Sequence, residues 1–185
     1  MRPVIVLTLV AFTCTLLLAM VSEATKEPIR LAQEAQKRKA IEALFDFNLK
    51  EVIEIEGREA LRVVGSSGEK ALVIESSTSE GYSGMITAVV GVRAGLIQNY
   101  NILTHTETPG LGDKISKEGS FKSQFTGKSL DGFVWRVKKD GGDVDGITAA
   151  TISSRAISHM LEKALRSAQS LGIDNHDIDS MEVQK

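Results

Sequence analysis

Cysteine is nearly absent from this sequence, since Cys14 is the only one among 185 residues. The chain on its own therefore forms no disulfide and offers no cysteine set for a metal ion or an iron–sulfur cluster. The three histidines are scattered, and no Cys-x-x-Cys-His segment is present for haem attachment. The net charge of -2 lacks the basic footprint of a nucleic-acid-binding protein. We therefore expect neither a metal site nor a nucleic-acid partner.

A Gly-x-Ser-x-Gly nucleophile elbow, internal repeats and a low-complexity linker are also missing. Ser153, Ser154 and His159 supply nucleophile and base types, but they fall where a helix is expected to begin. A serine there lacks the sharp turn that presents a hydrolase nucleophile. The sequence therefore disfavours a hydrolase, and we predict no catalytic residue.

The long apolar run of the chain lies at its N-terminus, where Val4–Val21 carries no charge and follows Arg2. As a helix rising ~1.5 Å per residue, this run would span about 27 Å, enough for the hydrocarbon core of a bilayer. We predict a membrane anchor over residues 1–24, with a cleavable signal peptide ending near Ser22–Ala24 as the alternative. Arg2 favours a cytoplasmic N-terminus, so we expect a single-pass protein of the cytoplasmic (inner) membrane with its domain on the extracytoplasmic, periplasmic face.

The residue pattern changes twice after the anchor. Residues 25–50 predict a linking helix that Thr25 could cap and in which Pro28 suits the first turn. Residues 51–172 predict one folded domain with its last helix ended by a glycine, and residues 173–185 predict a polar tail.

Within that domain, strict alternation from Glu51 onward, parted by glycine turns, indicates an antiparallel meander. The more continuously apolar Met85–Val92 and the following Ile97–Leu103 are expected to form the heart of the sheet. Phe133–Lys138 also alternates and predicts a further strand. We therefore expect an α+β fold, with an antiparallel or mixed β-sheet packed with helices.

The stretch that best indicates function is Asp145–Ser154. It begins with an Asp-Gly turn, and four hydroxyl side chains could cap a helix: Thr148, Thr151, Ser153 and Ser154. From Ile152 to Ala168 apolar residues recur at helical spacing. Thr151 falls at the first turn, where free N–H groups and the helix dipole favour a phosphate. The same pattern also fits an ordinary helix cap, whose loss in Thr151→Ala would cost about 1 kcal/mol.

This stretch resembles the flavinylation motif of the FMN-binding domain family, Asp-Gly-x-Ser/Thr-Gly-Ala-Thr-Ser/Thr-Ser/Thr. The matching residues are Asp145, Gly146, Thr148, Ala150 and Thr151. Ala149 stands where the family usually has glycine, a change that matters only if the backbone needs positive φ or close approach to a ligand. Two loops typical of the same family precede it in the right order, Glu80–Gly84 and His105–Gly112.

By this resemblance the chain carries FMN covalently, as a phosphoester of Thr151 installed by a flavin transferase that Asp145 helps to recruit. The other cofactor-binding candidates beside the linkage are Gly146, Thr148, Ala149 and Ala150. The candidates around the isoalloxazine ring are Tyr82, Ser83, Glu107, Thr108, Leu111, Gly112 and Lys114. For Lys114 a surface ion pair with Asp113 is the alternative to a role in stabilising reduced flavin.

Members of the family include the G subunit of the Rnf electron-transport complex and the C subunit of the sodium-pumping NADH:quinone reductase. The resemblance therefore implies an electron-transfer protein that works with the other subunits of an ion-translocating, Rnf-type ferredoxin:NAD oxidoreductase complex, rather than a stand-alone enzyme. Two alternatives are a free-standing anchored FMN protein and a non-redox anchored binding or assembly domain, in which Thr151 only caps a helix.

Overall fold

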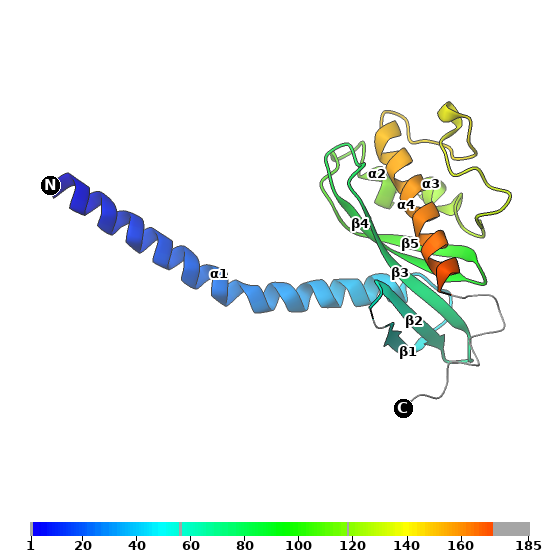
Figure 1. Cartoon of the computed structure of the whole chain (residues 1–185), viewed down its shortest axis with the longest axis horizontal. Helices are drawn as coiled ribbons and strands as arrows, with labels where there is room; N and C mark the ends of the chain where they lie inside the picture. The colour runs from blue at the N-terminus through cyan, green and yellow to red at the C-terminus, as the bar shows by residue number, and fades with distance from the viewer. Residues whose placement is uncertain (1, 56, 118, 172–185) are drawn as a thin grey trace. The chain divides into compact units, whose positions relative to one another are not determined.

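The computed structural model describes residues 2–55, 57–117 and 119–171, so the tail predicted for residues 173–185 and the helix end predicted at Gly172 lie outside it. The chain divides into two compact units, one ending at Arg38 and the other beginning at Lys39. The described part of the first unit is helical, whereas the second holds a sheet and further helices (Figure 1).

Helix α1 runs without interruption over Arg2–Glu42. Its most apolar stretch has a mean hydropathy of 2.7, so the helix is long and apolar enough to cross a membrane. The Thr25 hydroxyl donates to the Val21 carbonyl oxygen, 2.9 Å away, inside this helix. No separate helix therefore begins at Thr25, and Pro28 lies within α1 rather than in a first turn.

Five strands form one sheet in which each strand pairs antiparallel with the next along the chain. They are β1 Leu49–Glu54, β2 Ala60–Gly65, β3 Lys70–Thr78, β4 Ile86–Arg93 and β5 Leu96–His105. Only Ala94 and Gly95 join β4 to β5, with φ of 51° and 71°. Two positive φ values give the tight hairpin turn whose twist matches that of its strands. The predicted antiparallel meander and the α+β class are confirmed.

The most buried strands are β3 and β4, which hold the middle of the sheet beside each other. The prediction for Met85–Val92 is thus confirmed, but β5 is an edge strand, so placing Ile97–Leu103 at the heart of the sheet is wrong. The outer edge of β5 is partly covered because Ile97 exchanges main-chain hydrogen bonds with Gly127 (2.7 Å) and Lys128 (3.0 Å).

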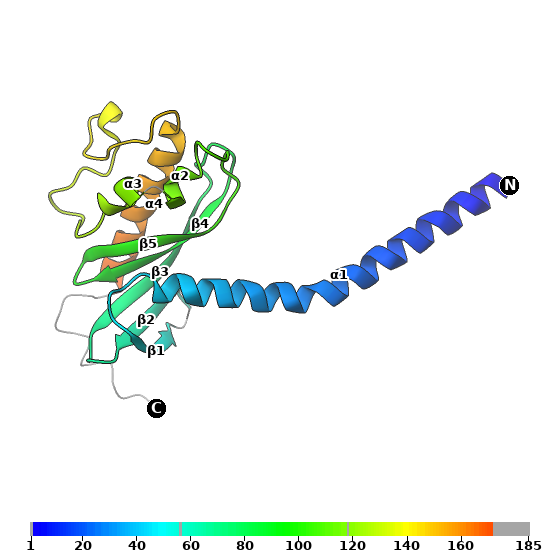
Figure 2. The same cartoon turned by 180° about the vertical axis from the view of Figure 1, so that it is seen from behind.

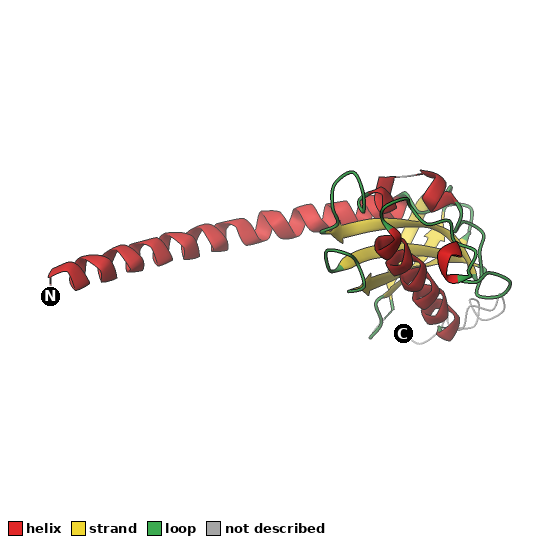
Figure 3. Ribbon diagram, turned by 90° about the horizontal axis from the view of Figure 1, so that it is seen from above, coloured by secondary structure: helices red, strands yellow, loops and turns green. Residues whose placement is uncertain are grey.

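Helix α4, Thr151–Ser170, lies across one face of this sheet (Figure 3). The predicted apolar stripe packs mainly on β3 and is buried at Ala156, Ile157, Met160, Leu161, Ala164, Leu165 and Ala168. Ile152, which the helical spacing assigned to the same stripe, is instead 44% exposed. The stripe therefore begins one turn into the helix and leaves the first turn beyond the sheet.

The same face carries the short helices α2, Lys114–Lys117, and α3, Gly119–Ser123. Their apolar side chains join a cluster of ring contacts formed by Tyr100, Phe121, Phe125, Phe133 and Trp135. Phe125 and Trp135 stack with their ring centroids 6.0 Å apart. This cluster supports the long connection between α3 and α4, coloured yellow in Figure 2.

That connection is irregular, so the strand predicted for Phe133–Lys138 is wrong. Only Val137 makes a single β-bridge, to Val144, and the 3-10 helix η1, Lys138–Asp140, follows at once. The Asp143 carboxylate accepts the Val134 N–H at 2.7 Å, where a strand would have offered a carbonyl. Alternation here reflects a loop with Trp135 and Val137 turned inward.

A smaller apolar cluster covers the opposite face of the sheet. Ile41 and Leu44, at and just after the end of α1, pack on Val63, Val73 and Val89. The two asparagines of β5 bind this segment by donating to carbonyl oxygens, Asn101 to Ala40 at 2.8 Å and Asn99 to Ala43 at 3.4 Å.

Tyr100 is fully buried, and its hydroxyl donates to the Ile115 carbonyl oxygen at 2.8 Å. Burial raises the pKa of this phenol well above its ordinary value. The unfolded chain then ionises first, so the stability that Tyr100 contributes is present below the unfolded pKa of ~10 and is lost as the pH rises above it. In an ultraviolet titration, one of the two tyrosines should ionise only as the circular dichroism is lost.

Tyr100→Phe should remove that late step and leave the far-ultraviolet spectrum at neutral pH unchanged. If both phenols of the wild-type protein ionise while it stays folded, the burial assigned to Tyr100 is wrong.

Candidate functional site

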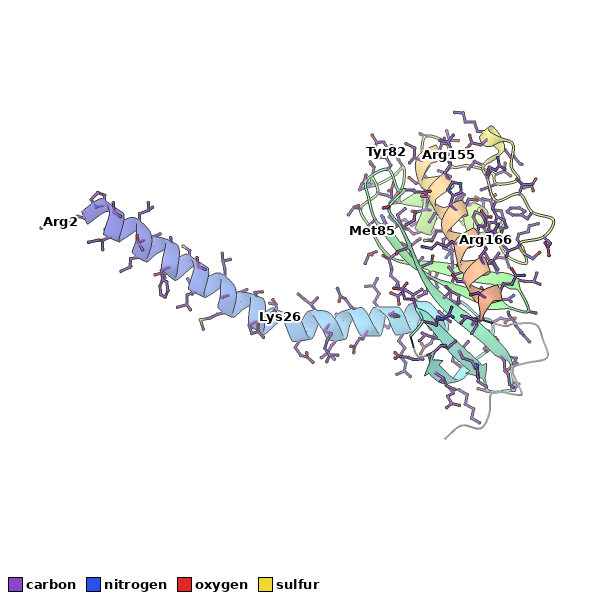
Figure 4. All side chains as sticks on the ribbon, viewed as in Figure 1. Arg2, Lys26, Tyr82, Met85, Arg155 and Arg166 are labelled. Carbon is purple, nitrogen blue, oxygen red and sulfur yellow. The ribbon has the colours of Figure 1, made fainter. Side chains whose placement is uncertain are left out.

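Three segments far apart in the sequence meet at the end of the domain where α4 begins. They are the Gly81–Gly84 loop after β3, the Glu107–Gly112 loop after β5, and Ala149–Ser153. Thr106, directly before the second segment, donates its hydroxyl to the Ser83 carbonyl oxygen of the first, at 2.8 Å. Figure 4 shows Tyr82 and Arg155 at this same end of the domain.

Between the three segments lies a hollow of about 480 Å³. Its wall combines apolar side chains, main chain and hydroxyls from Tyr82, Glu107, Thr108, Leu111, Gly112, Ala149, Ala150, Thr151, Ile152 and Ser153. Three of its apolar side chains are partly exposed, namely Tyr82 (69%), Leu111 (43%) and Ile152 (44%). A wall of this kind suits a flat, largely apolar ligand that carries a few polar groups.

Eight of the thirteen residues predicted to bind a cofactor line this hollow: Tyr82, Glu107, Thr108, Leu111, Gly112, Ala149, Ala150 and Thr151. The other five are not part of its wall: Ser83, Lys114, Asp145, Gly146 and Thr148. Sequence reasoning missed Ile152 and Ser153 as wall residues. Their place directly after Thr151, on the first turn of α4, was the available signal.

Within the part of the chain that the structure describes, no side chain caps the first turn of α4. The N-cap residue is Ala150, with φ −135°, and Thr151 is the first helical residue. Thr148, Thr151, Ser153 and Ser154 therefore do not cap the helix as predicted, and the first amide N–H groups of α4 are left for another acceptor. Because Thr151 caps nothing, the expected loss of about 1 kcal/mol in Thr151→Ala does not apply.

Two of the hydroxyls near Thr151 already form hydrogen bonds with other groups of the protein. Ser153 donates to Glu107 Oε2 at 2.6 Å, and its residue is only 2% exposed. Ser154 is fully buried, donates to the Ala150 carbonyl oxygen and accepts the Ile147 N–H, both at 2.9 Å. Thr151 is half-buried on the wall of the hollow, so its hydroxyl is the one best placed to react there.

Asp145 lies outside the hollow, on the surface. Its main chain is held on both sides by the Gln124 side chain, which accepts the Asp145 N–H at 2.7 Å and donates to the Asp145 carbonyl oxygen at 3.1 Å. The Asp145 carboxylate is exposed and meets the Lys138 ammonium at 2.7 Å. Asp145 therefore lies at the surface on a backbone that Gln124 holds on both sides.

Lys114 does not pair with Asp113, because the partner of Asp113 is Lys117. The Lys117 ammonium binds Asp113 Oδ2 at 2.6 Å, and this hydrogen bond lowers the pKa of the Asp113 carboxyl. The surface pair proposed for Lys114 is thus wrong. The cause is helical spacing: Asp113 directly precedes α2, and residues four apart along a helical turn face each other whereas neighbours do not.

An ion pair and a hydrogen bond of a histidine join α4 to the connection and to Glu80, directly before the Gly81–Gly84 loop. Arg155 donates to both oxygens of Asp140, with Nη2 at 2.7 Å, and lowers the pKa of that carboxyl. His159 Nδ1 lies 2.8 Å from Glu80 Oε2 on the helix surface. None of the four residues that form these two contacts lines the hollow.

The profile of the FMN-binding domain family matches residues 81–166, a range that spans all three segments of the site. The G subunit of the ion-translocating oxidoreductase complex of Shewanella oneidensis is 33% identical over 181 residues, covering 87% of this chain and 85% of the relative. The chain belongs to the family of these G subunits. The G subunit of the same complex in Vibrio vulnificus is 36% identical over 172 residues, with 82% of each chain covered.

Among solved structures, the C subunit of the Na(+)-translocating NADH-quinone reductase of Parabacteroides distasonis is similar, with a TM-score of 0.50 and 25% identity. The match covers 62% of this chain and spans 63% of the length of that one. The resemblance to the FMN-binding domain family is thus confirmed. With the apolar helix α1, membership of the family of G subunits indicates a membrane-anchored component of a multi-subunit oxidoreductase complex.

The residues of the hollow fit the FMN that the family implies. The volume of the hollow, about 480 Å³, lies in the range of small-molecule sites, about 300–1,000 Å³. Glycine at position 112 lets the main chain of this wall pass close to the Glu107 side chain, since a Cβ there would lie 2.5 Å from Glu107 Oε2. The uncapped start of α4, a helix of 20 residues, adjoins the same wall and suits a phosphate.

Ala149 is the point where this chain departs from the family motif, and its backbone has a φ of 63°. For a residue with a Cβ this left-handed conformation costs about 1–2 kcal/mol, whereas glycine adopts it freely. The positive φ therefore explains why the family motif has glycine at this position, and Ala149 leaves the backbone strained at the wall of the hollow.

Ala149→Gly should raise the free energy of unfolding by about 0.5–1 kcal/mol, because the relief of strain exceeds the added chain entropy of glycine. Chemical denaturation of the second unit would measure it. Ala94→Gly is the matched control, since Ala94 has a φ of 51° in the hairpin between β4 and β5, away from the hollow. It should stabilise similarly, and a destabilised Ala149→Gly would show that the alanine methyl is needed at this wall.

Proposed function

We propose that this protein binds one FMN as a phosphoester of Thr151 and relays electrons within an ion-translocating, Rnf-type oxidoreductase complex. One observation carries the proposal. On the wall of a flavin-sized hollow, Thr151 starts an uncapped helix while the neighbouring Ser153 and Ser154 hydroxyls are bound by protein groups. The names of the relatives supply the complex and its ion-translocating reaction.

FMN, when attached, supplies the electron chemistry, and the chain supplies attachment, orientation and shielding from water. The N–H groups at the start of α4 stabilise the charge that a phosphoester retains. Tyr82, Leu111 and Ile152 exclude water from the ring by covering it with apolar surface. A covalent link also prevents loss of the cofactor on a membrane face where no cytosolic FMN is at hand to replace it.

The residues outside the wall have roles around the site rather than in it. Asp145 is read by the flavin transferase, because its carboxylate is exposed on a backbone that Gln124 fixes. Gly146 and Thr148 continue that exposed turn toward Thr151. Ser83 contributes its main-chain N–H, which binds the Glu107 carboxylate. Lys114 places a positive charge close to the Leu111–Gly112 loop, and this charge favours the reduced flavin.

Thr151→Ala should abolish covalent attachment while the protein stays folded. Co-expressed with a flavin transferase, the wild-type chain should gain the mass of one FMN less one water, located by tryptic mapping in peptide 140–155, and the variant should gain none. Its stability should be equal to that of the wild type or a few tenths of a kcal/mol higher, because alanine is the better helix former.

Thr126→Ala, an exposed threonine outside the hollow, is the control and should keep the full mass gain. An unmodified wild-type chain beside an active transferase would contradict the proposal. It would favour the anchored binding domain, in which the hollow takes another ligand.

The domain is proposed to face the periplasm, since Arg2 favours a cytoplasmic N-terminus for α1. An alkaline phosphatase fused after residue 171 should then be active in intact cells, and a green fluorescent protein at the same point should be dark if exported unfolded. The reverse pattern would place the domain in the cytoplasm. The same two reporters fused directly before Arg2 are the control, and there the phosphatase should be inactive and the fluorescent protein bright.

A further inference from the structure

The carboxylate of Glu107 joins the two sides of the hollow. Glu107 is only 4% exposed although its side chain ends in a carboxyl group. Its Oε1 accepts the main-chain N–H of Ser83 at 3.1 Å, and its Oε2 accepts the hydroxyl of Ser153 at 2.6 Å. The first donor belongs to the Gly81–Gly84 loop and the second to the first turn of α4, so one side chain of the third segment binds the other two.

Two glycines leave the space that this carboxylate fills. A Cβ added at Gly81 would lie 2.6 Å from Glu107 Oε1 and closer still to the main-chain oxygen of Gly84, and one added at Gly112 would lie 2.5 Å from Glu107 Oε2. A side chain at Gly112 would therefore displace the carboxylate, and one at Gly81 would displace both the carboxylate and the main chain at Gly84. Glycine at both places leaves room for the carboxylate between the two loops.

A buried carboxylate is a costly way to make two hydrogen bonds. Among the described residues, no lysine, arginine or histidine forms an ion pair with Glu107, so its charge is compensated by hydrogen-bond donors alone. Hydrogen bonds to an ionised acceptor are shorter and about twice as strong as neutral ones. The charge thus holds two separate segments more tightly than a glutamine could.

The two donors stand directly beside the apolar residues on opposite sides of the hollow. Ser83 follows Tyr82, and Ser153 follows Ile152. Tyr82 is 69% exposed and Ile152 is 44% exposed, so core packing alone does not fix either side chain. The carboxylate of Glu107 therefore links the backbones that carry them at the hollow itself, whereas the contact of His159 with Glu80 joins the same segments on the surface outside its wall.

We propose that Glu107 is the positioning residue of the flavin site: its carboxylate pins the Tyr82 loop to the first turn of α4 and so keeps the hollow at the width of the ring. This rests on the proposed function, and it changes the role expected for Glu107. Both carboxylate oxygens face protein donors, so Glu107 acts on the flavin through Tyr82 and Ile152 rather than by direct contact.

The test compares Glu107→Gln with the wild type in two measurements. The first is amide hydrogen exchange of the flavin-free chain, read in a peptide that covers residues 80–84. The amide of glutamine keeps one acceptor but loses the charge, so exchange in this peptide should become about tenfold faster. The second is the fluorescence of the attached flavin, which a tyrosine held beside the ring quenches and which should rise several-fold in the variant.

Two further variants separate positioning from general stability. Asp143→Asn is the matched control, because the Asp143 carboxylate also accepts a main-chain N–H, that of Val134 at 2.7 Å, but in a loop outside the hollow. It should change neither measurement. Ser153→Ala releases only the helix side, so flavin fluorescence should rise while Ser83 stays protected from exchange.

The result that supports the proposal is faster exchange in residues 80–84 together with brighter flavin in a Glu107→Gln protein that melts within a few degrees of the wild type. Failure of this folded variant to load flavin, with faster exchange, supports it too. Unchanged exchange overturns it, and so does faster exchange with unchanged fluorescence, which would make Glu107 a structural residue only. A wild-type chain that takes no flavin would instead refute the proposed function, and the exchange data would still decide whether Glu107 pins the loop.

Discussion

The packing of α4 on β3 and β4 is the interaction on which the rest of the site depends. Burial of the stripe from Ala156 to Ala168 fixes the axis of the helix, and the missing apolar contact at Ile152 leaves its first turn projecting beyond the sheet. The loops after β3 and β5 end on the same side because these two strands flank β4 in an antiparallel sheet. The hydrophobic effect therefore places Thr151 beside both loops, and polar contacts then set the finer geometry.

Much of this arrangement could be predicted from the sequence, because it depends on patterns that are local. The period of the apolar residues identified α4 and the meander, and the order of three motifs identified the family. Eight predicted residues, Thr151 among them, do share one wall. The outline of the site followed from the motifs because each motif is a contiguous segment whose ends the fold brings together.

What could not be predicted are features decided by contacts between segments. Nothing in the sequence near Ser153 indicates that its hydroxyl binds Glu107, 46 residues earlier. Phe133–Lys138 alternates as a strand does, yet Asp143 takes the hydrogen bond that a neighbouring strand would need. Ile152 fits the helical stripe by spacing alone, and only the position of the sheet shows that it points elsewhere. The sequence likewise does not indicate that the start of α4 is uncapped, because four nearby residues have hydroxyl side chains of the kind that caps helices.

The order of the strands also has a consequence for how the domain matures. All five strands pair with their neighbours along the chain, and such short-range hairpins form early in folding because little loop-closure entropy opposes them. The contact of Ser76 with Met160 closes a separation of 84 residues and comes late by the same reasoning. By this reasoning the sheet forms before the hollow, and Thr151 acquires its surroundings only when α4 docks. If FMN is attached as proposed, its attachment would also report complete folding, because a chain in which α4 has not docked lacks the assembled wall of the hollow.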